Sequence, residues 1–286
     1  MARITDLCQT GRPVIICDVS PPRGIDLSAL DPLAEAPVDG LCVAYNPGKS
    51  VRLDSAVAAH ALRKRTGKEV VFNLATRDMN KLAIQSHLLG AHLLGLQNVV
   101  VVQGDPFTAR ELEKVQSVED FRATELMSSI RALNEGVDYR GLRLRQPTAF
   151  CVGASLDMGR GVAEEARLTR RKVEAGAEFF LTQPIYDVEQ ALRFEEAYAQ
   201  ASPEDPDPPV FYGLQVLVKE GVIFGNVPAA IVAELERGRP GVEIAGDLLR
   251  RFLERGLRHI YLVPPILKGG VRDYAAVNAL LRGLVP

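Results

Sequence analysis

The chain has 286 residues, of which 47% are hydrophobic and 24% are charged, so it can bury a large core. Its formal net charge of −2 gives no electrostatic reason to bind nucleic acid or an anionic membrane. No apolar run approaches the roughly 18 residues of a membrane span, and the first residues lack the hydrophobic core of a signal peptide. We therefore expect a cytoplasmic protein that binds neither nucleic acid nor membranes.

Strand-like and helix-like segments alternate along the chain. Eight apolar runs, many of them rich in β-branched residues, predict strands at 14–20, 40–45, 69–74, 98–102, 148–152, 179–182, 210–218 and 259–263. The segments between them predict helices at 27–36, 53–65, 80–94, 118–133, 162–175 and 248–257. Eight βα units without a long all-α or all-β segment predict an α/β fold, a single (β/α)8 TIM barrel over residues 1–286.

A doubly wound open sheet is the competing architecture. Such a sheet normally carries a GxGxxG turn after its first strand, but the turn here reads DVSPPRG, from Asp18 to Gly24. The barrel is therefore favoured. Two polar segments, 107–117 and 202–209, predict mobile surface loops, the first near the active face of the barrel and the second near the opposite face.

The cysteines and histidines do not suggest a metal site. The four cysteines, including Cys8, are far apart, with neither a CxxC pair nor zinc-finger spacing. Three lie in apolar strand-like runs, which predicts buried reduced thiols: Cys17, Cys42 and Cys151. The histidines fall in predicted helices or at the start of the last strand, where packing roles are expected: His60, His87, His92 and His259. We therefore expect neither a bound metal nor a Ser/His/Asp hydrolase.

Polar residues follow the predicted strands. The apolar run 98–102 continues through Gln103 into Gly104 and Asp105, which places an acid where a parallel strand ends. Other strand ends supply further polar groups, namely Asp18, Tyr45, Asn46, Asn73, Thr76, Ser155, Thr182 and Gln183. Two acids at this rim fit proton transfer and the recognition of a polar heterocycle. The residues alone indicate a barrel enzyme that acts on a small polar molecule.

Several motifs resemble the methylenetetrahydrofolate reductase family, in the same order and over nearly the whole chain. They are DVSPPRG from Asp18, VAYNP from Val43, RDMN from Arg77, the pair Gly104-Asp105, and KVEAGAEFFLTQPIYD from Lys172. The last block is the most specific. The sequence of these motifs is most similar to the branch of the family that is fused to homocysteine methyltransferases.

The resemblance implies a reaction and a set of residues. In this family, flavin (FAD) passes hydride to 5,10-methylenetetrahydrofolate and gives 5-methyltetrahydrofolate, a step of one-carbon metabolism and methionine biosynthesis. Asp18 takes the place of the family's glutamate as proton donor, and burial in a largely apolar site is expected to raise its pKa. The resemblance assigns substrate binding to Asp105, Gln183, Thr182 and Tyr261. It assigns cofactor binding to Tyr45, Asn46, Asn73, Thr76, Gly104, Asp105, Glu165 and Lys172.

The chain departs from the family pattern at several flavin contacts. Ala44, Asn73 and Gly153 stand where the family has threonine, histidine and tyrosine, and Gln103 replaces an arginine. Two alternatives follow. The chain is an FAD-dependent reductase that takes electrons from NAD(P)H or a partner protein, or a folate-binding paralogue or reductase subunit with weak or absent flavin. The 248–257 helix is also compatible with a homo-oligomer.

Overall fold

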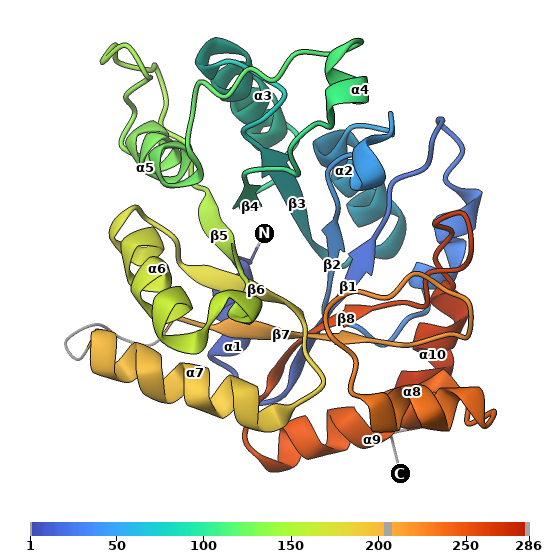
Figure 1. Ribbon diagram of the computed structural model, residues 1–286. Helices are drawn as coiled ribbons and strands as arrows, with labels where there is room; N and C mark the ends of the chain where they lie inside the picture. Colours follow the sequence, from blue (N-terminus) through green and yellow to red (C-terminus); the bar gives the residue numbers. More distant parts are fainter. Residues whose placement is uncertain (1, 203–207, 284–286) are drawn as a thin grey trace.

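Eight parallel strands close into a barrel, because each strand pairs with the next along the chain and β8 pairs back with β1 (Figure 1). The computed structural model describes residues 2–202 and 208–283. The strands are β1 (Val14–Val19), β2 (Gly40–Val43), β3 (Glu69–Ala75), β4 (Asn98–Val102), β5 (Cys151–Leu156), β6 (Phe179–Pro184), β7 (Val210–Gln215) and β8 (His259–Val263). The predicted (β/α)8 barrel is confirmed.

Helices surround the strands (Figure 1). The α-helices are α1 (Ile4–Cys8), α2 (Ser55–Thr66), α3 (Lys81–Leu93), α4 (Ala109–Leu112), α5 (Ala123–Asn134), α6 (Val162–Glu174), α7 (Val188–Ala201), α8 (Ala229–Glu236), α9 (Gly241–Glu254) and α10 (Tyr274–Arg282). Three short 3₁₀ segments are η1 (Ser28–Leu33), η2 (Pro47–Lys49) and η3 (Met158–Arg160). No helix within 2–202 and 208–283 is long and apolar enough to cross a membrane.

Two layers of apolar side chains hold the barrel together. The larger layer lies between the strands and the outer helices, and the smaller one fills the barrel interior. The interior residues are Ile4, Val14, Ile16, Cys42, Val71, Val100, Cys151, Phe179, Leu181 and Phe211. Because side chains alternate along a strand, this filled interior leaves the next inward positions at the carboxyl end of the barrel for polar groups.

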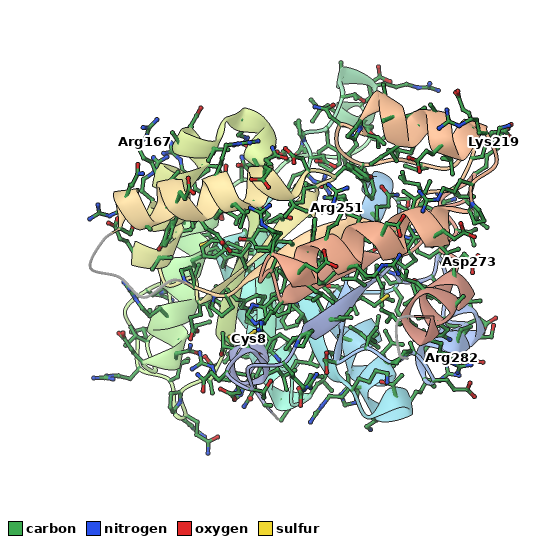
Figure 2. All side chains as sticks on the ribbon, turned by 90° about the horizontal axis from the view of Figure 1, so that it is seen from below. Cys8, Arg167, Lys219, Arg251, Asp273 and Arg282 are labelled. Atoms are coloured by element: carbon green, nitrogen blue, oxygen red, sulfur yellow. The ribbon has the colours of Figure 1, made fainter. Side chains whose placement is uncertain are left out.

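The short helix α1 closes the end of the barrel where the strands begin. Ile4 is fully buried in the interior layer, and its backbone N–H donates to Oδ1 of Asn98 at 2.8 Å. Figure 2 shows Cys8, on α1, and Lys219, on the segment after β7, at opposite ends of the barrel. The sequence did not predict this helix, because five residues are too few for a periodic pattern.

Several predicted boundaries were wrong. The helix predicted at 27–36 is the shorter 3₁₀ segment η1 (Ser28–Leu33), which contains Pro32, and the helix expected from residue 118 begins at Ala123. The polar segment 107–117 contains the helix α4, which Thr108 caps. The segment 202–209 lies largely outside the described residues. All four cysteines are free, as predicted.

The fifth strand runs from Cys151 to Leu156, whereas the sequence predicted 148–152. The prediction stopped before Gly153, because glycine commonly ends strands. In the fold, Gly153 lies within β5 because the ring of Phe179 fills the space of a side chain there. A Cβ at this position would lie 2.4 Å from the ring.

This packing predicts the effect of adding one methyl group. Gly153→Ala forces Phe179 to move and should lower the free energy of unfolding by about 1–3 kcal/mol. Gly90 in α3 is the matched control, because a Cβ there would meet nothing within 4 Å. Gly90→Ala should raise stability by roughly 0.5–1 kcal/mol. Urea unfolding measures both changes, and an unchanged Gly153→Ala variant would contradict the packing of Phe179 on β5.

Candidate active site at the barrel mouth

The mouth of the barrel is formed by the carboxyl ends of the strands and the loops that follow them. Because the strands are parallel, Asp18 on β1, Asp105 after β4 and Gln183 on β6 lie at the same end of the closed barrel. In (β/α)8 barrels this end carries the active site. The three residues were predicted to meet one ligand, and the topology places them around one opening.

Asp18 is held by two side chains from the opposite end of the sequence. The Tyr261 hydroxyl donates to Oδ1 of Asp18 at 2.7 Å, and Nε of Arg272 donates to Oδ2 at 3.2 Å. Asp18 is 4% exposed, and the Arg272 side chain is 7% exposed. Burial, followed by the charge of Asp18, raises the pKa of Tyr261 well above its usual value. Tyr261 therefore stays protonated and donates to the carboxylate.

The surroundings of Asp18 differ from the expectation. Burial is found, but a guanidinium and a phenol contact the carboxyl group where an apolar pocket was expected. The structure therefore places Asp18 in a buried contact with Arg272 and Tyr261 at the end of β1.

Arg272 belongs to a hairpin that follows β8. Ile266 and Arg272 form an antiparallel bridge, and Leu267 and Gly270 bond across the turn. Gly269 and Gly270 both have positive φ, which suits the turn. The sequence did not reveal the role of Arg272, although the glycine pair in its segment is a turn signal.

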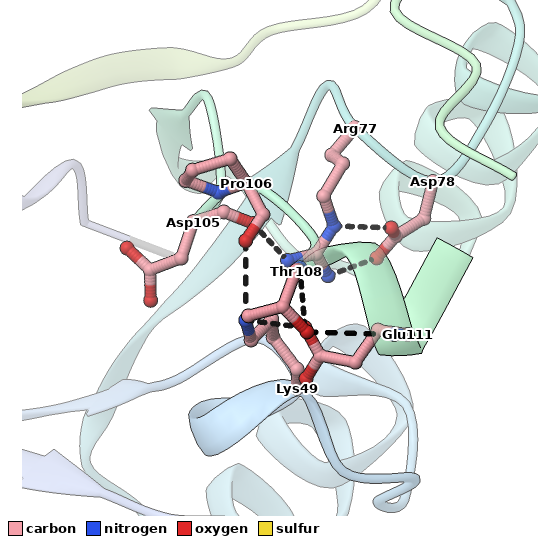
Figure 3. Close-up of polar contacts among 7 residues, drawn as sticks. All are labelled: Lys49, Arg77, Asp78, Asp105, Pro106, Thr108 and Glu111. Atoms are coloured by element: carbon pink, nitrogen blue, oxygen red, sulfur yellow. Dashed lines mark hydrogen bonds and ion pairs between the residues drawn. The ribbon is translucent and has the colours of Figure 1, made fainter. Parts of the chain in front are cut away.

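Asp105 is fixed through its backbone while its carboxylate stays open. Nη1 of Arg77 donates to the Asp105 carbonyl at 2.7 Å, and the Arg77 guanidinium also pairs with Asp78 and lies over the Phe107 ring. Lys49 donates to the Pro106 carbonyl at 3.1 Å. Figure 3 shows the Asp105 carboxylate pointing away from Lys49 and Arg77. Within the described residues, no group donates a hydrogen bond to this carboxylate, so it is available to a ligand.

The mouth-facing loops after β2 and β3 use their polar groups internally. Burial, followed by the charge of Asp78, raises the pKa of Tyr45 to about 12. Oδ1 of Asn46 accepts from the Arg52 backbone N–H at 3.2 Å. The Thr76 hydroxyl donates to the Gln103 carbonyl at 3.4 Å, and Asn73 accepts a weak bond from the thiol of Cys42.

Thr182 and Gln183 lie side by side on β6 but differ in their surroundings. The Thr182 hydroxyl donates to the Gln183 carbonyl and accepts from the Gly213 N–H, both at 2.7 Å. These bonds occur where the pairing of β6 and β7 is irregular. Thr182 is buried, whereas Gln183 is exposed. Gln183 therefore presents the free side chain of this pair.

Glu165 and Lys172 form a buried ion pair behind β5. Nζ of Lys172 lies 3.0 Å from Oε1 of Glu165 and donates to the Ser155 carbonyl at 2.6 Å. Burial lowers the pKa of Lys172, and the charge of Glu165 opposes that shift. Oε2 of Glu165 is buried and has no partner within the described residues. Lys172 on α6 is therefore buried and paired, and its ammonium group does not extend into solvent.

Gln215 holds the segment after β7, a role that the sequence did not reveal. Its Nε2 donates to the Val222 carbonyl at 2.7 Å, and its Oε1 accepts from the Phe224 N–H at 2.9 Å. The Tyr186 hydroxyl donates to the Phe224 carbonyl at 3.1 Å. The buried side-chain amide of Gln215 therefore orders the loop that follows β7.

A hollow of about 870 Å³ lies at the opposite end of the barrel, lined by residues that include Cys8 and His259. Its arginines are engaged: Arg3 pairs with Glu178, and Arg258 donates to the Gly11 carbonyl. Across 2–202 and 208–283, no group of three or more His, Cys, Asp or Glu could hold a metal ion. The free carboxylate and amide of the mouth therefore make it the stronger candidate for chemistry.

The closed barrel defines the chain as a (β/α)8 protein whose mouth carries acidic and amide side chains. The family model for methylenetetrahydrofolate reductase matches residues 3–220, and the chain belongs to this family. The resemblance that the motifs predicted is thereby confirmed.

Known proteins similar to the chain agree with this assignment. Methylenetetrahydrofolate reductase 1 of Schizosaccharomyces pombe is 23% identical over 71% of the chain and 34% of its own length. A probable methylenetetrahydrofolate reductase (NADH) of Oryza sativa subsp. japonica is 23% identical over 91% of the chain and 47% of its own length. The chain thus spans less than half of these curated relatives.

A solved structure shares the fold. An uncharacterized protein from Clostridium thermocellum, described as binding two copies of 5-methyl-5,6,7,8-tetrahydrofolic acid, superposes with a TM-score of 0.68. The match covers 98% of this chain and 97% of that protein at 14% sequence identity. At this identity the likeness supports the barrel architecture.

The buried pair behind β5 predicts a measurable stability effect. Lys172→Met leaves Glu165 charged and without a counter-ion, which should lower the free energy of unfolding by about 3–5 kcal/mol. Replacing both residues by Met should recover most of that loss, because no buried charge is left. Urea unfolding of the single and double variants measures the difference. A single variant as stable as the wild type would show that the pair is not buried in solution.

Proposed function

We propose that the mouth binds a reduced folate and that the chain reduces 5,10-methylenetetrahydrofolate to 5-methyltetrahydrofolate. The observation that carries this proposal is the buried acid Asp18, fixed by Tyr261 and Arg272, at the same end of a family barrel as the open carboxylate of Asp105. Folate binding by the fold neighbour from Clostridium thermocellum supports the substrate class.

The pterin ring would be held by Asp105 and Gln183. A carboxylate accepts from the ring amino group and the adjacent N–H, and an amide both donates and accepts, so the two side chains complement the amide-like edge of a pterin. Both side chains are exposed at the mouth. In this proposal Thr182 supports Gln183 through the backbone, and Tyr261 acts on substrate through Asp18.

Asp18 is proposed to handle the proton that opens the bridged ring of the substrate. That ring opens to a cationic iminium once N10 carries a proton. A carboxyl group at this position can deliver the proton, and its negative charge can then stabilise the cation. Tyr261 and Arg272 fix both oxygens of Asp18, which keeps its geometry constant during the reaction.

FAD is the hydride carrier that the family suggests, and the described residues fit it poorly as they are arranged. A flavin diphosphate needs a cation, but the cations beside the residues that the resemblance assigns to the cofactor are paired: Lys49 with Glu111, Arg77 with Asp78 and Lys172 with Glu165. Phe179 fills the space beside Gly153, where the family carries a tyrosine.

These paired cations favour a second candidate function. The chain would bind folate with weak or absent flavin, as a paralogue or as a subunit of a multi-protein reductase without direct NAD(P)H activity. In the first candidate, electrons come from NAD(P)H or from a partner protein. The proposal also includes assembly of the chain into a homo-oligomer.

The role of Asp18 predicts a split between catalysis and binding. Asp18→Asn should slow the reduction of methylenetetrahydrofolate by about 10²–10⁴-fold, the loss expected for a general acid, while folate binding stays nearly intact. Asp105→Asn is the matched control and should weaken folate binding more than it slows the bound reaction. Steady-state kinetics with separate binding titrations measure both, and unchanged turnover of Asp18→Asn would remove Asp18 from the mechanism.

The visible absorption spectrum of the purified chain tests whether it binds flavin. Because the nearby cations are already neutralised, we expect the chain to purify without colour and to gain flavin absorption only with FAD in excess. Flavin bands that survive purification would contradict weak binding. Complete absence of uptake, with folate binding retained, would contradict flavin dependence and support the second candidate.

A further inference from the structure

The exposed residues of α3 from Leu82 to Leu93 are all uncharged. Leu82, Leu89 and Leu93 are 64%, 40% and 87% exposed. The other exposed residues of this stretch are small, namely Ala83, Ser86 and Gly90. The outward faces of α5, α6, α7 and α9 carry exposed charged residues instead. Exposed leucines gathered on one helix mark an interaction surface, and these six residues are called the α3 face below.

The remaining sides of α3 are occupied by its own chain. Leu88 is completely buried, and Nε2 of Gln85 donates to the Ser129 hydroxyl of α5 at 2.8 Å. On the other flank, Nδ1 of His60 on α2 lies 2.9 Å from the Leu94 carbonyl oxygen. Figure 1 shows α3 on the outside of the barrel between α2 and α5. The α3 face is therefore a fixed surface that its own chain leaves uncovered.

Acidic residues lie at the start of the α3 face. Glu119 and Asp120 are exposed, and Asp120 accepts the backbone N–H of Lys81 at 3.3 Å. The Lys81 ammonium group lies 5.0 Å from the centre of the Phe121 ring. Across 2–202 and 208–283, neither acid forms an ion pair, so both carboxylates are open to a cation from outside.

Basic residues lie at the other end of the α3 face. Nη1 of Arg63, near the end of α2, donates to the Gly95 carbonyl just after α3 at 3.4 Å. Lys64 follows Arg63 and is exposed. Among the residues that the structure describes, no acid pairs with either cation. The α3 face is thus apolar in the middle, negative at its start and positive at its end.

The sequence suggested another helix for an interface between copies of the chain. Its apolar positions at 248–257 fall on α9, where Leu248, Leu249 and Phe252 are buried within the fold. Those residues are therefore not available to a second copy, whereas the leucines of the α3 face are exposed.

We propose that the α3 face binds α3 of a second copy of the chain, with the two helices antiparallel. In a two-fold interface every contact from one residue to another is repeated in reverse. Leu82 then lies opposite Leu93 of the partner subunit, and Leu89 lies opposite the small Ser86 of the partner subunit. The acids at the start of each α3 meet the basic residues at the end of the other, whereas a parallel pair would bring like charges together. This inference is independent of the proposed function.

A charge exchange across the proposed contact tests it. The variants are Leu82→Lys, Leu93→Glu and the double variant with both changes. The two positions lie about 16 Å apart along one helix, at about 1.5 Å per residue, so the new charges are too far apart to pair within one copy. Val232→Lys on α8 is the matched control, because Val232 is exposed and α8 lies on the opposite side of the barrel from α3 (Figure 1).

Sedimentation equilibrium over a range of protein concentrations measures association, and thermal melting checks that each variant is folded. Wild type should form a dimer. Each single variant should raise the dissociation constant about tenfold or more, because it places an unpaired charge against a leucine at two symmetric positions. The double variant should dimerise more tightly than either single variant, and added salt should weaken its dimer more than that of wild type. Val232→Lys should behave like wild type.

Three results would overturn the proposal. Wild type that stays monomeric at every concentration shows that the α3 face does not bind a second copy. A dimer that persists unchanged in both single variants uses another surface. Single variants that dissociate without any recovery in the double variant show that the two helices are not antiparallel.

Discussion

A carboxylate and a guanidinium share a buried position at the end of β1, and much of the mouth depends on this contact. Asp18 and Arg272 are 254 residues apart in sequence, and their ion pair links the first strand to the hairpin after the last one. Tyr261 adds a hydrogen bond from β8, and Tyr274 accepts the N–H of Ser20. Removing either charge would leave the other buried and unpaired, which is costly.

Separate ion pairs determine which other charges near the mouth remain open to a ligand. Lys49, Arg77 and Lys172 are neutralised by acids of their own, so the loops after β2 and β3 and the region behind β5 are internally satisfied. The carboxylate of Asp105 is not satisfied in this way, and it suits a ligand that presents hydrogen-bond donors, as the pterin of a reduced folate does.

The sequence predicted the strand order and most strand positions, because each buried parallel strand is a short apolar run with turn residues after it. It also predicted which strand ends carry Asp18, Asp105 and Gln183. It failed at β5, since the place of Gly153 within a strand depends on the ring of Phe179 from the neighbouring strand. Arg272 was missed for the same kind of reason. Its role comes from a hairpin that folds back on β1, and no local pattern encodes such a contact.

The structure of the chain with 5-methyltetrahydrofolate bound is the most direct test of this account. The account predicts the pterin edge against Asp105 and Gln183, and N10 beside Asp18. A folate found in the hollow beside α1, or at the mouth with its ring turned away from Asp105, would contradict it.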